Sequence, residues 1–260
     1  MIYVITGKKF NTDLLTDRYR VLQVGFDELI DSGFLRDNEG DNIAHKNRSY
    51  CELTGIYWIW KNIKSAETVG IVHYRRFFTT AAGDFFYTYF GIKPKLLKDS
   101  CMDKALKKYD VILPKRERIV RTLKQYYAEL HDITDWENTG EIIREICPEY
   151  YDSFLKVSKD HFFYYGNMMI CTRKIFDNYA GWLFPILEKL EQITDINKYR
   201  DDYNRRVFGF IAERLLQVYV YHNRLKVKEY PVFNTEYRRM NIFKKNLNRF
   251  YTLIGKERKK

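Results

Sequence analysis

Long apolar runs, proline, glycine and paired cysteines are all scarce in this sequence of 260 residues. No stretch approaches the roughly 18 consecutive apolar residues that a membrane-spanning helix requires. The 5 prolines and 13 glycines are too few for a low-complexity or collagen-like chain. The four cysteines (Cys51, Cys101, Cys147 and Cys171) include no C-x-x-C pair, so neither a zinc ribbon nor a thiol redox motif is expected.

The common nucleotide-binding and hydrolase motifs are also missing. The sequence contains no G-x-x-x-x-G-K-[ST], G-x-G-x-x-G, G-x-S-x-G or H-E-x-x-H. Without a glycine loop, any phosphorylated ligand must be held by side chains, and arginine suits this because its planar guanidinium matches phosphate oxygens. The first ten residues place an apolar run before Lys8 and Lys9, the reverse of a signal peptide, so we expect a cytoplasmic protein.

Positive charge is in excess and is concentrated near the end of the sequence. The 45 Lys and Arg against 34 Asp and Glu give a net charge of +11. Residues 241–260 hold seven Lys or Arg and one acid, so this segment alone contributes +6. A nucleic-acid-binding protein would more often spread such charge over a face, so no nucleic-acid partner is expected.

Residues 241–260 also have a helical pattern. Their apolar residues recur at steps of three and four, with cations on much of the opposite side. This pattern predicts a basic amphipathic helix that binds an anionic membrane surface. The alternative is that the apolar stripe packs on the preceding domain, which we place at residues 1–240.

Alternating strand and helix patterns predict the fold class. Segments with β character are residues 2–6, 69–74, 110–114, 162–172 and 226–233. Segments with helical spacing are residues 53–63, 99–108, 119–160 with a break at Cys147-Pro148, 174–192 and 203–220. Residues 13–47 are rich in turn residues and are interpreted as loop. The alternation predicts a single α/β domain with a mostly parallel central sheet flanked by helices.

One predicted strand runs directly into a polar and basic cluster. The apolar run from Val69 ends in His73, Tyr74, Arg75 and Arg76. Ligands bind beyond the carboxyl ends of the strands in open α/β sheets, so this cluster is well placed to hold a diphosphate. The alternative is that Arg75 and Arg76 form surface ion pairs and that His73 is a satisfied core histidine.

Several stretches together resemble a known family. They are Asn42-Ile-Ala, the run from Tyr50 to Asn62, and Val69-Gly-Ile-Val-His-Tyr-Arg-Arg76. They are similar to capsular and exopolysaccharide glycosyltransferases, a family first catalogued as a domain of unknown function, in which some members are galactofuranosyltransferases. Further landmarks of the family appear at residues 110–114, 131–132, 166–170, 182–184 and 206–215, so the resemblance covers about residues 1–222.

The resemblance implies a GT-A-like nucleotide-diphospho-sugar fold. It also implies a hexosyltransferase with a nucleotide-diphosphate donor, UDP-linked in our expectation, and a lipid-linked saccharide acceptor. The expected setting is the inner face of the cell membrane, in capsule, exopolysaccharide or O-antigen synthesis. The alternative from another class is a non-catalytic protein that holds nucleic acid by positive charge and aromatic stacking.

The His73–Arg76 cluster is the expected diphosphate site. GT-A enzymes usually place an Asp-x-Asp there to hold Mn²⁺ or Mg²⁺, whereas this sequence has two arginines whose charge could offset the diphosphate. We therefore expect transfer without a divalent metal, with Asp84, Asp201, Asp202 and His222 as possible ligands otherwise. Two further donor-site candidates are Lys61 and Glu52. Glu52 also has the spacing of a capping-box partner for Ser49.

Catalysis by inversion needs a carboxylate that takes the proton of the acceptor hydroxyl. The candidates for this base are Asp132, Asp135 and Glu213. The candidates for the acceptor side of the cleft are His131, Asn167, Arg205 and Arg206. Asn167 lies in an apolar run, so its amide must bond backbone or ligand. Arg206 and Glu213 are seven residues apart and could instead form an ion pair on one helix face.

Overall fold

The sheet is built around parallel strands near its middle. The computed structural model describes residues 1–25, 28–199 and 201–236. All five residues of β1 (Ile2–Thr6) are buried. β2 (Tyr19–Gln23) and β4 (Thr68–His73) pair with β1 in parallel on its two sides. Strands buried on both faces are almost continuously apolar, which is why β1 and β4 are recognisable in the sequence.

The main sheet follows the order β10-β6-β9-β4-β1-β2-β3, with β5 paired to β4 and to β11 beside this path, and β7 and β8 form a separate two-stranded sheet. β9 runs antiparallel between β4 and β6, while the β10–β6 and β2–β3 pairs are parallel. The remaining strands are β3 (Leu35–Arg36), β5 (Arg76–Phe78), β6 (Val111–Pro114), β7 (Glu117–Arg118), β8 (Phe162–Phe163), β9 (Met169–Thr172), β10 (Val227–Tyr230) and β11 (Val232–Asn234). The predicted α/β fold with a mostly parallel central sheet is confirmed.

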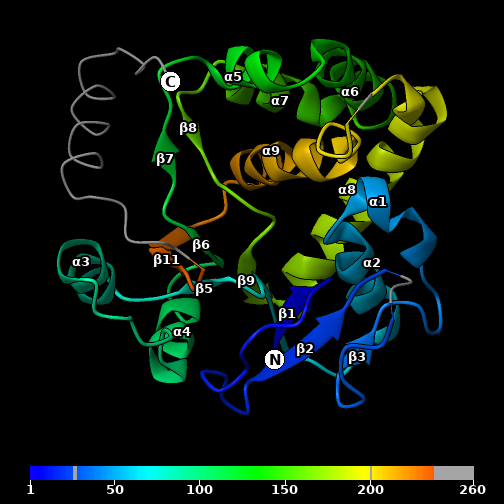
Figure 1. Ribbon diagram of the computed structural model, residues 1–260. Helices are drawn as coiled ribbons and strands as arrows, with labels where there is room; N and C mark the ends of the chain where they lie inside the picture. Colours follow the sequence, from blue (N-terminus) through cyan, green and yellow to red (C-terminus); the bar gives the residue numbers. More distant parts are fainter. Residues whose placement is uncertain (26–27, 200, 237–260) are drawn as a thin grey trace.

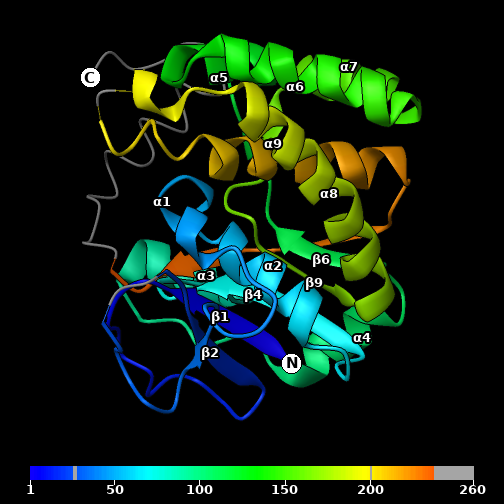
Figure 2. The same ribbon diagram turned by 90° about the vertical axis from the view of Figure 1, so that its right-hand side faces the viewer.

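Helices cover the two faces of the sheet unequally (Figures 1 and 2). α2, α8 and α9 pack on one face, and α5, α6 and α7 form a further layer beyond α9. The other face carries α4, whose Met102 and Ala105 pack with Val4 and Ile112. The described helices are α1 (Asn47–Tyr50), α2 (Leu53–Asn62), α3 (Ala81–Phe90), α4 (Asp99–Leu106), α5 (Leu123–Leu130), α6 (Ile133–Ile146), α7 (Tyr151–Ser158), α8 (Arg173–Ile193) and α9 (Val207–His222), with short 3₁₀ turns η1 (Ala44–Lys46), η2 (Pro148–Tyr150) and η3 (Ile196–Lys198).

Three secondary-structure predictions are wrong in detail. Residues 13–47 contain β2 and β3, whose short runs are hidden between turn residues. The helical region predicted over 119–160 has its expected break at Cys147-Pro148, but a second, unexpected break at Asp132, which caps the start of α6, divides it into three helices. The apolar run 162–172 is broken between β8 and β9 at Gly166, whose φ is +73°. The sequence pattern also missed α3, which has no buried residue and therefore no apolar stripe facing a core.

Two predictions concern the membrane. None of the helices in the part of the chain that the structure describes is long and apolar enough to cross a bilayer. The amphipathic segment predicted at residues 241–260, and with it the domain boundary at 240, lies outside the described residues.

Candidate functional site

A cavity of about 700 Å³ opens at the carboxyl ends of β1 and β4. Residues 6–8 follow β1 into the cavity, and residues 73–76 follow β4 into it. Further walls come from the turn at Cys51, from Tyr126 and Tyr165, and from the first half of α9. Its charged lining residues are Lys8, Arg48, Glu52, Arg75, Arg76, Asp202, Arg206, Glu213 and Arg214. Six cationic side chains against three carboxylates favour an anionic ligand at this edge of the sheet.

The His73–Arg76 segment reverses the chain at the mouth of this cavity. His73 ends β4 and pairs with Arg76, which begins the antiparallel β5. The turn is held against β1 because the Tyr74 N–H donates to the Ile5 carbonyl at 3.1 Å. Arg75 forms an ion pair with Glu236 at 3.2 Å, whereas Arg76 forms none with any described residue. The two arginines are therefore not equivalent, and Arg76 is the one left available to a ligand.

His73 and Arg76 face the backbone of Gly166. A Cβ atom built on Gly166 would lie 3.4 Å from Nη1 of Arg76 and 3.5 Å from Nε2 of His73. Nε2 of His73 is buried and has no hydrogen-bond partner among the described residues. Burial lowers the pKa of His73, so the ring is neutral at pH 7. A neutral imidazole nitrogen and a guanidinium thus point into the same small space.

Glu213 joins this group from the middle of α9. Its Oε1 accepts a hydrogen bond from the N–H of Gly166 at 3.1 Å, and its side chain is only 16% exposed. Burial raises the pKa of Glu213 to about 7, while the charges of Arg214 and Arg76 oppose the rise. A carboxyl with a pKa near the working pH is well suited to accept a proton during a reaction.

Arg214 lies behind Glu213 and was not among the predicted site residues. It is 2% exposed, and its Nη1 donates to the Phe210 carbonyl at 2.8 Å and lies 3.5 Å from Oε2 of Glu213. Its guanidinium carbon lies 5.0 Å from the ring centre of Tyr127 and 4.6 Å from that of Phe163. The two aromatic rings help to hold this buried cation next to Glu213. Its positive charge lowers the pKa of Glu213 and so opposes part of the rise that burial causes.

Residues 1–224 match the family model described as Domain of unknown function (DUF4422). The chain belongs to this family. A comparison with solved structures finds similarity to the apo structure of WbbM, a bifunctional glycosyltransferase, with a TM-score of 0.77 and 29% sequence identity. The match covers 91% of this chain and 45% of that chain, so this chain spans less than half of the bifunctional protein. A comparison with curated proteins finds no match.

Both matches bear on the sequence predictions. The resemblance to a family catalogued as a domain of unknown function is confirmed over the whole of residues 1–222, for which it was predicted. The similarity to WbbM confirms that the α/β fold is one found in a glycosyltransferase.

Of the three candidate bases in this DUF4422 protein, one lies at the cavity. Glu213 lines it, whereas Asp132 and Asp135 are not among its lining residues. Lys198 lies 2.9 Å from Asp132 and 3.2 Å from Asp135, and Tyr199 donates a hydrogen bond to Asp135. The hydrogen bond from Lys198 lowers the pKa of Asp132, and burial raises that of Asp135. These two carboxylates therefore stabilise the start of α6 rather than face the ligand site.

The capping-box interpretation of Ser49 and Glu52 is wrong. Ser49 lies inside α1, and Glu52 precedes α2 without any side-chain capping bond. Oε1 of Glu52 instead accepts a hydrogen bond from Nδ2 of Asn167 at 2.7 Å. Asn167 is fully buried and also donates to the Gly209 carbonyl at 3.4 Å, so it lies behind the cavity and holds Glu52 at its wall.

The remaining acceptor-side candidates divide into two groups. His131 and Arg206 line the cavity. The ring of His131 stacks on that of Phe210, with the ring centres 4.1 Å apart. Nε of Arg206 lies 2.9 Å from Sγ of Cys51. Burial lowers the pKa of His131 to about 4. Among the described residues, Arg206 forms no ion pair with Glu213. Arg205 lies outside the cavity lining and pairs with Asp202 at 3.0 Å.

Lys61 is not brought to the site. It lies at the carboxyl end of α2, whose amino end is next to Glu52, and ten helical residues span about 15 Å. Its Nζ lies over the Trp60 ring, 3.9 Å from the ring centre. We infer that its role is packing on the helix surface.

The possible metal ligands are dispersed. Within residues 1–25, 28–199 and 201–236, no three His, Cys, Asp or Glu residues are grouped so that they could hold an ion. Asp84 lies in the first turn of α3, and His222 lies 3.3 Å from Ser153 at the end of α9. Asp202 lines the cavity but is paired with Arg48 at 2.7 Å.

Proposed function

We propose that this protein is a glycosyltransferase that moves a sugar from a nucleotide-diphosphate donor to a hydroxyl of a saccharide acceptor. The observation that carries the proposal is the meeting of Glu213, Arg76 and His73 around Gly166, at the carboxyl ends of β1 and β4. A proton acceptor with a pKa of about 7 next to an available guanidinium meets the two needs of sugar transfer.

The donor diphosphate is assigned to Arg76, with Arg75 and Lys8 at the mouth of the cavity. Charge-assisted hydrogen bonds from guanidinium groups are shorter and stronger than neutral ones, and they neutralise the charge that grows as the diphosphate leaves. On this assignment the transfer proceeds without a divalent metal. From the family resemblance, we favour a UDP-linked hexose, galactofuranose or another.

We assign to Glu213 the role of accepting the proton of the acceptor hydroxyl. As the acceptor oxygen bonds to the anomeric carbon, its proton passes to the Glu213 carboxylate, and the bond from that carbon to the diphosphate breaks. The hydrogen bond from Gly166 fixes Oε1, and we assign the proton to Oε2, which lies 3.5 Å from Nη1 of Arg214. We assign the orientation of the acceptor to His131 and Arg206, which also line the cavity.

The proposed acceptor is a lipid-linked saccharide at the inner face of the membrane, in capsule, exopolysaccharide or O-antigen synthesis. This rests on the family resemblance and on the basic pattern of residues 241–260, for which we expect salt-sensitive binding to anionic vesicles.

The test is ligand binding followed by thermal unfolding. UDP and UDP-hexoses should stabilise the protein by about 2.7 kcal/mol at 100 times their dissociation constant. GDP, CDP and single-stranded RNA serve as comparisons. Stabilisation by RNA but by no nucleotide sugar would overturn the proposal in favour of nucleic-acid binding.

A further inference from the structure

α3 presents an unusual concentration of exposed aromatic side chains. Phe85, Phe86 and Phe90 are 50%, 47% and 58% exposed, and Ile92 just after the helix is 58% exposed. The three phenylalanine rings lie 5.6–6.1 Å from one another, so they form one continuous apolar patch. A patch of this kind on a soluble protein usually marks a surface that is covered by a partner or a lipid.

The orientation of α3 is determined by the rest of the fold. On its inner side, the Tyr87 hydroxyl donates to the Asn234 carbonyl at 2.9 Å, and the Tyr87 ring packs edge-on against Phe233. Thr80 caps the start of the helix, and Gly91 ends it with a φ of +68°. Because one side is tied to β11 by Tyr87, the phenylalanine patch is held outward. Figure 1 shows α3 at the edge of the molecule, away from the layer of α5 to α7.

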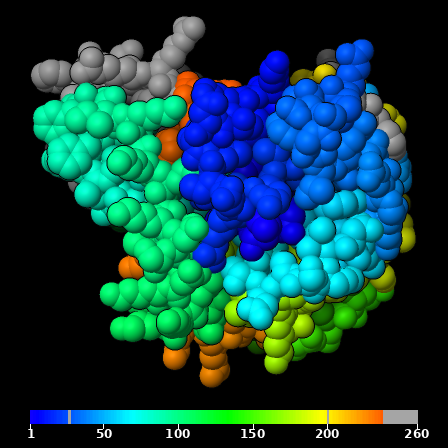
Figure 3. Space-filling model, turned by 90° about the horizontal axis from the view of Figure 1, so that it is seen from below, coloured from blue at the N-terminus to red at the C-terminus, as the bar shows by residue number. Residues whose placement is uncertain are grey.

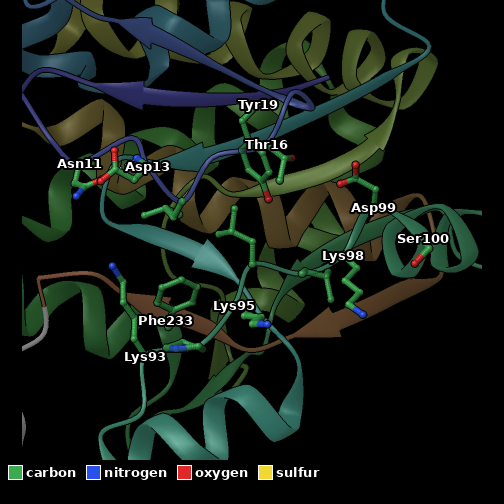
Figure 4. A pocket seen from close by; sticks show the side chains of 14 residues that line it. Asn11, Asp13, Thr16, Tyr19, Lys93, Lys95, Lys98, Asp99, Ser100 and Phe233 are labelled. Carbon is green, nitrogen blue, oxygen red and sulfur yellow. Dashed lines mark hydrogen bonds between the residues drawn. The ribbon is translucent and has the colours of Figure 1, made fainter.

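Three exposed lysines follow the patch directly. Lys93, Lys95 and Lys98 line one side of a groove of about 760 Å³, with Asn11, Asp13 and Thr16 on the other side (Figure 4). None of the three forms an ion pair with another described residue. The acids nearby are Asp84 on α3, and Asp13 and Asp99 in the groove. In Figure 3 the green atoms of the α3 and α4 region form one edge of the molecule beside the blue amino-terminal residues.

We propose that α3 and the lysines that follow it form a docking surface for an anionic lipid bilayer. Aromatic side chains with flanking cations are the composition that binds at the boundary between headgroups and acyl chains. The phenylalanine patch would enter that boundary, and Lys93 and Lys95 would meet lipid phosphates. A symmetric contact with a second copy would instead bring two sets of these lysines into one interface, where their charges repel one another.

The carboxyl-terminal end of the described chain lies close to α3. β11 ends at Asn234, in contact with α3, and the described chain reaches Glu236 two residues later. The last described residue of the chain, Glu236, therefore lies two residues beyond the contact between Asn234 and α3. The proposal itself concerns α3 and does not depend on sugar transfer.

The experiment is flotation of the full chain with vesicles of phosphatidylcholine alone or mixed with phosphatidylglycerol. The wild type should float with the anionic vesicles. The double variant Phe85→Ser/Phe90→Ser should bind them at least about tenfold more weakly, because it removes two half-exposed aromatic side chains from the lipid contact. Lys93→Glu/Lys95→Glu should also lose about tenfold or more, and this loss should diminish at high salt.

The matched control is Leu155→Ser/Ile193→Ser, which removes two exposed apolar side chains, 40% and 58% exposed, from α7 and α8. It should float like the wild type. Unchanged melting temperatures in solution show that all variants fold.

Four outcomes would overturn the proposal. The first two are absence of wild-type flotation and equal flotation of the wild type and the phenylalanine variant. The third is a phenylalanine variant whose only change is a smaller mass in solution, which would indicate a second copy. Increased proteolysis of residues 237–260 in that variant without vesicles would assign the patch to that segment, and would also overturn it. No sugar nucleotide enters this assay, so its failure is separate from a failure of the proposed transferase activity.

Discussion

The N–H of Gly166 donates a hydrogen bond to Oε1 of Glu213 at 3.1 Å, between residues 47 positions apart in the chain. This contact ties the turn before β9 to the middle of α9, and it places the carboxylate next to His73 and Arg76. The bond to a backbone N–H also favours the ionised carboxylate, against the larger effect of burial.

Replacing Glu213 should abolish turnover without abolishing donor binding. In Glu213→Gln the amide oxygen keeps the bond to Gly166 but cannot take a proton, so we expect turnover to fall about 10²–10⁴-fold. Turnover and the dissociation constant for UDP-hexose are measured separately. Asp132→Asn is the control and should keep near-normal turnover, since its carboxylate caps α6. Equal losses in both variants would contradict the assignment.

The pH dependence should follow the same residue. For kcat/KM we expect a rise with pH with an apparent pKa of about 7, which is absent in Glu213→Gln. A profile that is flat between pH 5 and 8 would show that Glu213 is not the proton acceptor.

The free energy of unfolding should decrease as the pH rises, whereas kcat/KM should increase. The unfolded carboxyl ionises near its ordinary pKa of 4.5 and the folded one near 7, so the folded state keeps a proton that the unfolded state has lost. Stability therefore falls as the pH rises through this window, by about 3 kcal/mol in total. Glu213→Gln should be more stable than the wild type to urea at pH 8 and similar to it below pH 4.5. A variant that is less stable at pH 8 would contradict the raised pKa.

Arg76 should contribute more to donor binding than Arg75. Loss of a charge-assisted contact to phosphate costs about 1.5–3 kcal/mol, so Arg76→Ala should bind UDP-hexose about 10- to 100-fold more weakly. Arg75→Ala should lose less, because this guanidinium is shared with Glu236. Isothermal titration measures both, with the distant surface variant Arg144→Ala as the control.

The same binding model predicts metal independence. Wild-type turnover should survive excess chelator, because the guanidinium groups offset the diphosphate charge. Complete loss of activity, restored by Mn²⁺, would refute this part of the proposal.

A methyl group at Gly166 should disturb both the fold and the site. Its φ of +73° is strained for alanine, which costs about 1–2 kcal/mol, and the added Cβ would enter the space between Arg76 and His73. Gly166→Ala should therefore melt at a lower temperature and bind donor weakly. Gly40→Ala is the matched control, since Gly40 has a φ of +61° but lies away from the cavity, against Asn62. It should lose stability and retain donor affinity.

The sequence by itself determined the strands that are buried on both faces and the helix with a single apolar stripe. β1, β4 and α8 could be predicted because burial of a whole strand or of one helix face requires apolar residues at a simple period. The placement of His73–Arg76 at the edge of the sheet where the cavity opens followed as well, since these residues come at the carboxyl end of a strand. α3 could not be predicted, because a helix with no buried residue has no such pattern.

Only the tertiary structure decided which of the three carboxylates lines the cavity. Asp132, Asp135 and Glu213 all lie in segments that the sequence predicts to be helical, and no local spacing shows which of them reaches the cavity. Lys198 and Tyr199 hold the two aspartates, whereas the turn at Gly166 brings Glu213 to Arg76. The raised pKa of Glu213 depends on water being excluded by side chains from several distant segments and on charges brought near it by the fold. These contributions to the pKa come from residues that are far apart in the sequence, so the sequence alone does not reveal them.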